Sequence, residues 1–201
     1  MPDDPSAANP PPPVWSATAL LDILERALHQ SSSEWLFFRE LRIGTGRTAT
    51  SLQRLDAFAL NAFPHLGMRR VCYEIKISRS DFRGEVKRPL KRRIGMRFSN
   101  EFYFVAPAGL LAPSEIPIDC GLIEIGVATQ QEWNAMVQER GELVWFDPMM
   151  SAYCAVVVPA CWRDTPGPTW QFVAAMLRNQ RREFEERPPT PPKQTKLDLT
   201  P

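Results

Sequence analysis

The sequence predicts an α/β domain in which helices flank a mixed β-sheet. Several segments alternate apolar and polar residues, as strands do, whereas others repeat apolar residues every three or four positions, as helices do. A predicted helix also separates the third predicted strand from the fourth. Such a crossover makes that pair of strands parallel, so the sheet should contain both antiparallel and parallel neighbours.

The first half of the domain is predicted to contain one helix and three strands. Leu20, Leu24 and Leu28 recur at helical spacing after Ser16, which is a favourable N-cap residue. The turn residues in "NAFPHLGM" join the second and third strands, which should therefore form a hairpin. The predicted strands cover residues 34–45, 51–60 and 69–78.

A second helix should follow the third strand. Ser78 provides the helix-start signal, and Phe82, Val86 and Leu90 recur at every fourth residue as a core-facing stripe. Pro89 should either kink this helix or start a second short one. Beyond it the patterns predict strands at 101–109 and 121–127, a hairpin within 128–160 and a helix at 169–187.

Proline marks both ends of the chain. Eleven of the twenty prolines lie in the first thirteen and last fourteen residues. Proline fixes φ and lacks an N–H, so residues 1–15 and 188–201 are predicted to be disordered tails around a single domain at 16–187. The proline-rich tails therefore allow one interpretation of the function, namely an interaction protein whose tails bind protein partners.

Composition narrows the classes of function. The chain has no basic start followed by an apolar stretch and no apolar run of membrane length, so a cytoplasmic protein with no membrane partner is expected. No two of the four cysteines form a C-x-x-C pair and there are only two histidines, which argues against a zinc site. The net charge of +1 indicates no partner by itself.

Positive charge is concentrated in one segment. Residues 69–97 contain eleven Arg or Lys against three Asp or Glu, so this segment carries +8 and the remainder of the chain −7. A basic patch on an otherwise acidic protein favours a polyanion such as DNA, although a solvated helix face would show the same pattern. Contacts with DNA are predicted for Ser78, Arg79, Arg83, Lys87 and Lys91.

Two carboxylates and a lysine should converge on one patch of the sheet. Glu74 and Lys76 share one face of the third strand, while Ile77 belongs to its opposite, apolar face. A hairpin that closes near residue 60 places Asp56 opposite Glu74 or one residue away, with Cβ atoms about 5 Å apart. Mg²⁺ or Mn²⁺ would relieve the repulsion between two carboxylates and activate a water, and a nearby lysine would assist. This combination predicts hydrolysis of a phosphodiester, whereas a solvated strand face is the simpler alternative.

The motifs resemble those of the PD-(D/E)xK nuclease superfamily over roughly residues 38–126. The stretches concerned are "RLDAFAL", "YEIKISRSDFRGEVKRP" and "NEFYFVAPAGLLAPSEIPIDCGLIEIG". Within the superfamily they are most similar to MmcB-like DNA-repair proteins and related phage or prophage proteins. The resemblance implies a restriction-endonuclease-like core and Mg²⁺-dependent cleavage of DNA. It matches Asp56 and Glu74 to the metal-binding acids and Lys76 to the catalytic lysine.

The resemblance leaves several points open. A further acid comes from either Glu25 or Glu40, and Glu40 is preferred because it borders the strand beside Asp56. The carbonyl of Ile75 is an additional candidate metal ligand. Leu55 stands where the superfamily's name has proline, at a position that varies widely. A DNA-binding module that cuts nothing would use the same fold, and a homodimer is compatible with the sequence.

Overall fold

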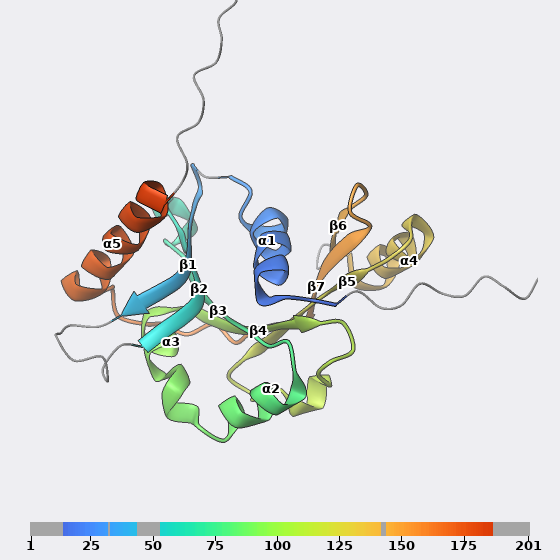
Figure 1. Cartoon of the computed structure of the whole chain (residues 1–201), viewed down its shortest axis with the longest axis horizontal. Coiled ribbons are helices and arrows are strands. Elements are labelled where there is room, and N and C mark those ends of the chain that lie inside the picture. Colours follow the sequence, from blue (N-terminus) through green and yellow to red (C-terminus); the bar gives the residue numbers. More distant parts are fainter. Residues whose placement is uncertain (1–13, 32, 44–52, 142–143, 187–201) are drawn as a thin grey trace, which may run out of the picture.

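A computed structural model describes residues 14–31, 33–43, 53–141 and 144–186 and bears out the α/β architecture (Figure 1). One seven-stranded sheet has the order β1-β2-β3-β4-β5-β7-β6, and helices flank it. The strands are β1 (Trp35–Ile43), β2 (Gln53–Asn61), β3 (Arg70–Ile75), β4 (Glu101–Pro107), β5 (Gly121–Val127), β6 (Val144–Asp147) and β7 (Ala152–Val158). The α-helices are α1 (Ala17–Leu28), α2 (Arg79–Val86), α3 (Arg93–Phe98), α4 (Gln130–Arg140) and α5 (Trp170–Glu186), with 3-10 turns η2 (Pro64–Leu66), η3 (Pro89–Arg92) and η4 (Pro113–Glu115).

The sheet is mixed, as the crossover predicted. Strands β1, β2 and β3 form an antiparallel meander, and β4 then pairs with β3 in parallel after the α2–α3 connection. Strand β5 is parallel to β4, and the β6–β7 hairpin extends the far edge in antiparallel pairing. This arrangement is consistent with the predicted restriction-endonuclease-like α/β fold.

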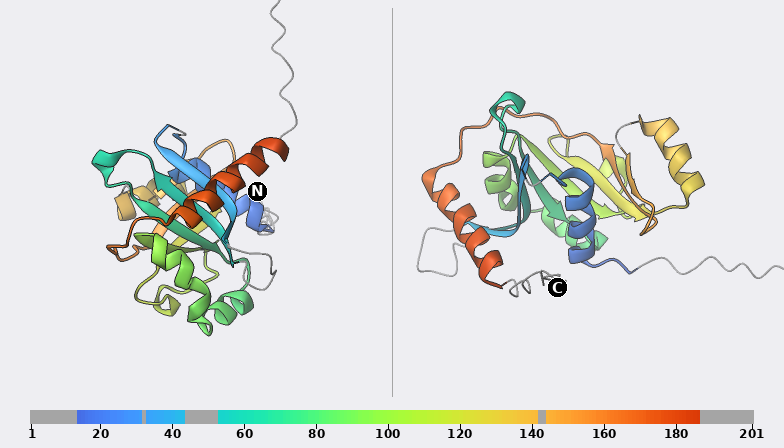
Figure 2. Two further views of the ribbon diagram at one scale, coloured as in Figure 1. Left: turned by 90° about the vertical axis from the view of Figure 1, so that its left-hand side faces the viewer. Right: turned by 90° about the horizontal axis from the view of Figure 1, so that it is seen from above.

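Two apolar cores lie on the two faces of the sheet, because the central strands are buried on both sides. Helix α1 covers one face, where Leu20 and Leu24 pack with the β3 and β4 residues of that side. Phe82 of α2, Phe98 of α3 and Phe172 of α5 belong to the core of the other face. Figure 2 shows α5 lying across the β1–β2 end of the molecule, with α4 and the β6–β7 hairpin at the opposite end.

Strand β2 separates from β3 in the middle of the sheet. Their backbone pairing ends at Ala57–Tyr73, whereas β3 remains paired with β4 as far as Ile75–Val105. Beyond that point the N–H of Ile75 donates to the side chain of Asp56, at 2.9 Å from Oδ2. The divergence opens the sheet at the residues that the sequence singled out.

Three details of the predicted elements are wrong. Ile77 is 50 % exposed, because β3 ends at Ile75 and the chain turns toward the N-cap of α2. Leu90 is 73 % exposed, because α2 stops before Pro89 and that proline begins η3, the second of the two outcomes expected for it. Helix α4 was not predicted, although Thr129 and Glu132 form a capping box at its start.

The proline-rich ends fall outside the described residues almost entirely. The prediction of disorder for residues 1–13 and 188–201 therefore concerns segments that the structure does not describe. Within the described tail, Trp15 packs against the core on the α1 side of the sheet. No helix among the described residues is long and apolar enough to cross a membrane.

Candidate active site

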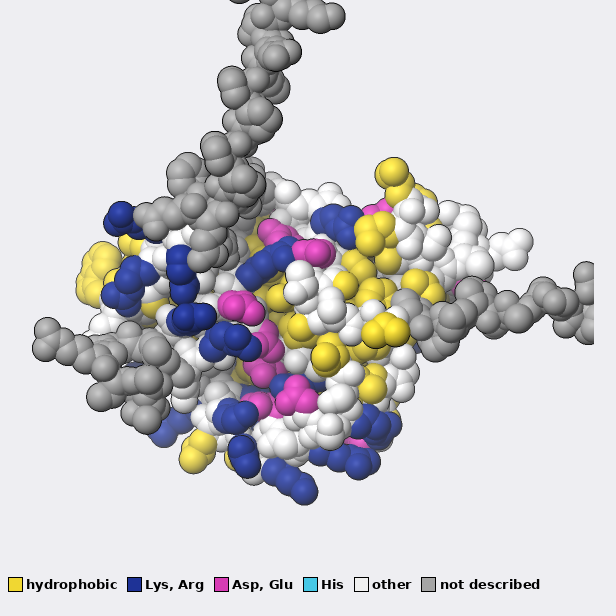
Figure 3. All heavy atoms as spheres, viewed as in Figure 1, with side chains coloured by type: hydrophobic (Ala, Val, Ile, Leu, Met, Phe, Trp, Pro, Cys, Tyr) yellow, Lys and Arg dark blue, Asp and Glu magenta, His cyan; other side chains and the backbone are white. Residues whose placement is uncertain are grey.

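A cavity of about 300 Å³ lies where β2 separates from β3. Side chains from α1, β1, β2, β3 and α2 surround it. Its ionisable lining consists of Glu40, Arg54, Asp56, Glu74, Lys76, Asp81, Glu85 and Lys91. Five carboxylates face three cations, so the lining carries −2 when every group is ionised. We call this space the acidic cavity. In Figure 3, Asp and Glu side chains gather at the centre of the face that is turned toward the viewer, with Lys and Arg side chains beside them.

Asp56 and Glu74 are neighbouring, largely buried carboxylates. By the register of the adjacent pairs they lie directly opposite each other, which is the first of the two placements expected from the sequence. Burial raises the pKa of Asp56, and the N–H of Ile75 and the charge of Lys76 offset this only in part. Burial and the charge of Asp56 together raise the pKa of Glu74 to about 7. The positive charge near the two carboxyls therefore does not compensate for their burial and mutual repulsion, and both ionise at pKa values above the ordinary range.

Lys76 supplies the buried positive charge of the acidic cavity. Its side chain is 3 % exposed, and Nζ lies 3.0 Å from Glu74 Oε1 and 3.3 Å from Asp81 Oδ2. Burial lowers the pKa of Lys76, but the carboxylates of Glu74, Asp81 and Glu85 outweigh burial and raise it above the ordinary value. Lys76 therefore remains an ammonium ion at neutral pH and holds its charge beside Glu74.

Glu85 belongs to the site, although the sequence analysis did not select it. Its side chain is 5 % exposed on α2, with Oε2 at 3.9 Å from Lys76 Nζ and 3.5 Å from Lys91 Nζ. A signal was present in the sequence, because Glu85 follows the core residue Phe82 by three positions and so shares its helix face. A carboxylate on the apolar face of a helix marks either a buried ion pair or a functional site.

The choice between Glu25 and Glu40 favours Glu40 as the acid nearer the site. Glu40 lines the acidic cavity and lies between the two β1–β2 pairs that flank Asp56, whereas Glu25 forms an ion pair with Arg39. Glu40 is more exposed than the other acids, and it pairs loosely with Arg54 at 3.6 Å. Its φ of 48° is unusual for a residue with a side chain and marks a local distortion of β1 at this point.

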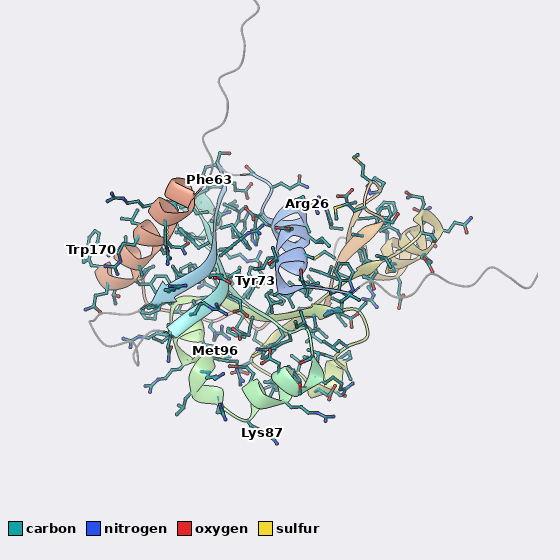
Figure 4. The ribbon with its side chains drawn as sticks, viewed as in Figure 1. Arg26, Phe63, Tyr73, Lys87, Met96 and Trp170 are labelled. Carbon is teal, nitrogen blue, oxygen red and sulfur yellow. The ribbon has the colours of Figure 1, made fainter. Side chains whose placement is uncertain are left out.

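The residues predicted to contact DNA are distributed around the site rather than inside it. Of the five, Lys91 alone lines the acidic cavity. Ser78 caps α2 by accepting from the Asp81 N–H, and Arg79 pairs with Glu115 at 2.6 Å. Arg83 and Lys87 are exposed, and in Figure 4 the Lys87 side chain extends outward from the edge of the molecule.

The carboxylates of the acidic cavity provide oxygen donors for a metal ion. Over the described residues, no cluster of three or more His, Cys, Asp or Glu side chains is arranged as a ready-made metal site. Asp56 uses Oδ2 and Glu74 uses Oε1 in their hydrogen bonds within this part of the chain, which leaves one oxygen of each available. Two available carboxylate oxygens and a lining charge of −2 match a hard divalent cation, which commonly takes one or two protein carboxylates and completes its shell with water and substrate.

Comparisons with known proteins bear on the fold alone. No protein-family profile matches the chain, and no curated protein does. Among solved structures, the SPO1766 protein of unknown function from Silicibacter pomeroyi is similar, with a TM-score of 0.50 and 15 % sequence identity. The match covers 83 % of this chain and 86 % of that protein. The architecture thus recurs in a protein of similar extent, and at this identity the likeness is limited to the fold.

Proposed function

We propose that the protein is a metal-dependent nuclease that hydrolyses phosphodiester bonds in DNA. The observation that carries the proposal is the acidic cavity, in which Asp56 and Glu74 face each other beside the buried Lys76. The resemblance of the surrounding motifs to PD-(D/E)xK nucleases supports it. DNA repair, or the processing of phage or prophage DNA in the cytoplasm, is the role that this resemblance favours.

Asp56 and Glu74 are the residues that would hold Mg²⁺ or Mn²⁺, with the Ile75 carbonyl and Glu40 as further candidates. Such an ion would polarise a phosphoryl oxygen and lower the pKa of a bound water. Lys76 contributes a fixed positive charge that can stabilise the negative charge developing on the phosphate. Glu85 and Asp81 keep Lys76 charged and hold its ammonium group in place. Burial strengthens each of these electrostatic interactions.

A DNA-binding module without catalytic activity is the second candidate. The specific observation in its favour is that Lys76 Nζ already lies within 4 Å of carboxylates from three residues, Glu74, Asp81 and Glu85. The lysine therefore neutralises part of the acidic cavity without a metal. The two functions differ in one measurable requirement, because a nuclease needs a divalent cation bound through Asp56 and Glu74.

Incubation with labelled linear, nicked and branched DNA tests the proposal directly. We expect cleavage with Mg²⁺ or Mn²⁺ and none with EDTA. Cleavage that persists at the same rate in EDTA would refute a metal-dependent mechanism. Binding of DNA without cleavage of any of the three substrates, in either metal, would favour the non-catalytic module.

The exposed cations of α2 allow a separate prediction about binding. If Arg79, Arg83 and Lys87 contact phosphates, replacing all three by Ala should reduce the slope of log K against log salt by roughly 0.9 per contact, or about 2.7 in all. Titrations of duplex DNA at several salt concentrations, in Ca²⁺ to suppress cutting, measure the slope. The Asp56→Asn variant is the control with an unchanged slope. An unchanged slope in the triple variant would make the basic helix a solvated surface.

A further inference from the structure

A second cavity, of about 240 Å³, adjoins the acidic cavity and has the opposite charge. The two share the side chains of Arg54, Glu74, Glu85 and Lys91. Gln53, Leu55, Arg92 and Phe102 complete the lining of the second. Three cations face two carboxylates there, so we call it the basic cavity. A cavity of net negative charge and a cavity of net positive charge thus share the side chains of Glu74 and Glu85.

Arg92 is the unusual residue of the basic cavity. It is 7 % exposed, and within the described residues it makes no ion pair. Its Nη1 donates to the Glu85 carbonyl at 3.2 Å and its guanidinium lies over the Phe104 ring at 5.7 Å, but its buried Nε has no hydrogen-bond partner in the described structure. A buried charge with no carboxylate within ion-pair distance and a buried donor without an acceptor are both costly. An anionic ligand in the basic cavity would supply the missing counter-charge.

The neighbouring cations are placed to bind the same anion. Lys91 precedes Arg92 in η3 and is held beside the Glu85 carboxylate, and Arg54 reaches the cavity from β2. Both side chains are about half exposed, so a ligand can enter from solvent.

We propose that Arg92, together with Arg54 and Lys91, binds a phosphate group of a nucleic-acid strand in the basic cavity. The planar guanidinium suits phosphate, which offers several acceptor oxygens, better than a point charge does. The choice of nucleic acid as the ligand rests on the proposed function. A strand that presents one phosphate to the acidic cavity would place another phosphate beside Arg92. Arg92 would then fix the register of the strand relative to Asp56 and Glu74.

The Nε–H resonance of Arg92 in ¹⁵N-labelled protein reports on this binding without any variant in the sample. In EDTA, we expect that resonance to shift saturably on addition of inorganic phosphate, and at lower concentrations on addition of a thymidine tetranucleotide. The spectrum of Arg92→Lys identifies the resonance, and exposed Arg93 is the matched control that should not shift. An Arg92 resonance that neither ligand moves would refute the subsite, as would an equal shift of Arg93. A shift with inorganic phosphate alone would refute the assignment to nucleic acid.

A substitution measures the contribution to affinity. Arg92→Met keeps an apolar side chain of similar length against Phe104, so we expect the fold to be retained and tetranucleotide affinity in EDTA to fall about tenfold. Arg93→Met should leave the affinity unchanged, and equal affinities for Arg92→Met and wild type would overturn the proposal. Binding is measured in EDTA, where metal-dependent cleavage is prevented, so it is independent of the cleavage assay. A protein that does not cleave DNA with Mg²⁺ or Mn²⁺ but shows Arg92-dependent binding in EDTA refutes the nuclease alone. An active protein without that dependence refutes the subsite alone.

Discussion

Replacing Asp56 by Asn is expected to reduce DNA cleavage by roughly a thousandfold, equivalent to about 4 kcal/mol of transition-state stabilisation. The amide oxygen of Asn can still accept the hydrogen bond from the Ile75 N–H, which is 2.9 Å from Asp56 Oδ2 in the wild type. What the substitution removes is the negative charge beside Glu74. Initial rates on labelled DNA at saturating Mg²⁺ give the ratio.

Companion variants separate the roles of the neighbouring residues. Glu74→Gln and Lys76→Met should lose cleavage to a similar extent, since each removes one charge from the same cavity. Neither carboxylate variant, Asp56→Asn or Glu74→Gln, should show the wild-type rise in melting temperature on addition of Mn²⁺, since these two acids are the residues that would hold the metal. Asp164→Asn is the matched control, because Asp164 is exposed and, among the residues that the structure describes, accepts a hydrogen bond from Trp162 alone. A Lys76→Met protein that cuts at the wild-type rate would show that the catalytic assignment is wrong.

The central residues of the site could be predicted because they depend on local rules. Strand periodicity places Glu74 and Lys76 on one face, and the turn fixes the hairpin register that sets Asp56 opposite Glu74. Both steps need only the order of residues along two adjacent strands. The parallel pairing of β3 with β4 followed in the same way from the helical crossover between them.

The remaining residues of the site depend on how distant elements pack. Glu85 lines both cavities because α2 packs on the face of the sheet that carries Glu74. Arg92 lines the basic cavity because the chain turns into η3 at Pro89, after the end of α2. Periodicity assigned Leu90 to the core, and this same change of direction is why it is exposed. The basic segment was recognised from its composition, but composition did not distinguish exposed Lys87 from buried Arg92. That distinction requires the tertiary structure.

The second large effect concerns stability and pH. Folding raises the pKa of Glu74 from 4.5 to about 7, so between these values the unfolded chain releases the proton while the folded protein keeps it. The unfolded state then binds fewer protons, and stability falls as the pH rises. The contribution of Glu74 to the free energy of unfolding should therefore decrease by about 3 kcal/mol between pH 4.5 and 7 and stay low above pH 7. Glu74→Gln removes this contribution and should be more stable than the wild type at pH 8.

The difference between wild type and Glu74→Gln is the quantity to measure, because His29 has the opposite effect. Burial and the charge of Arg69 lower the pKa of His29 from 6.5 to about 3, so below pH 6.5 the unfolded state binds more protons at this residue and stability rises with pH. Urea unfolding of both proteins at pH 5 and pH 8 cancels the His29 contribution. We expect the Gln variant to gain on the wild type as the pH rises, and Mg²⁺ at pH 8 to reduce that gain by stabilising the ionised Glu74. A difference that stays constant from pH 5 to pH 8 would show that the carboxyl of Glu74 ionises normally and that the acidic cavity does not lack positive charge.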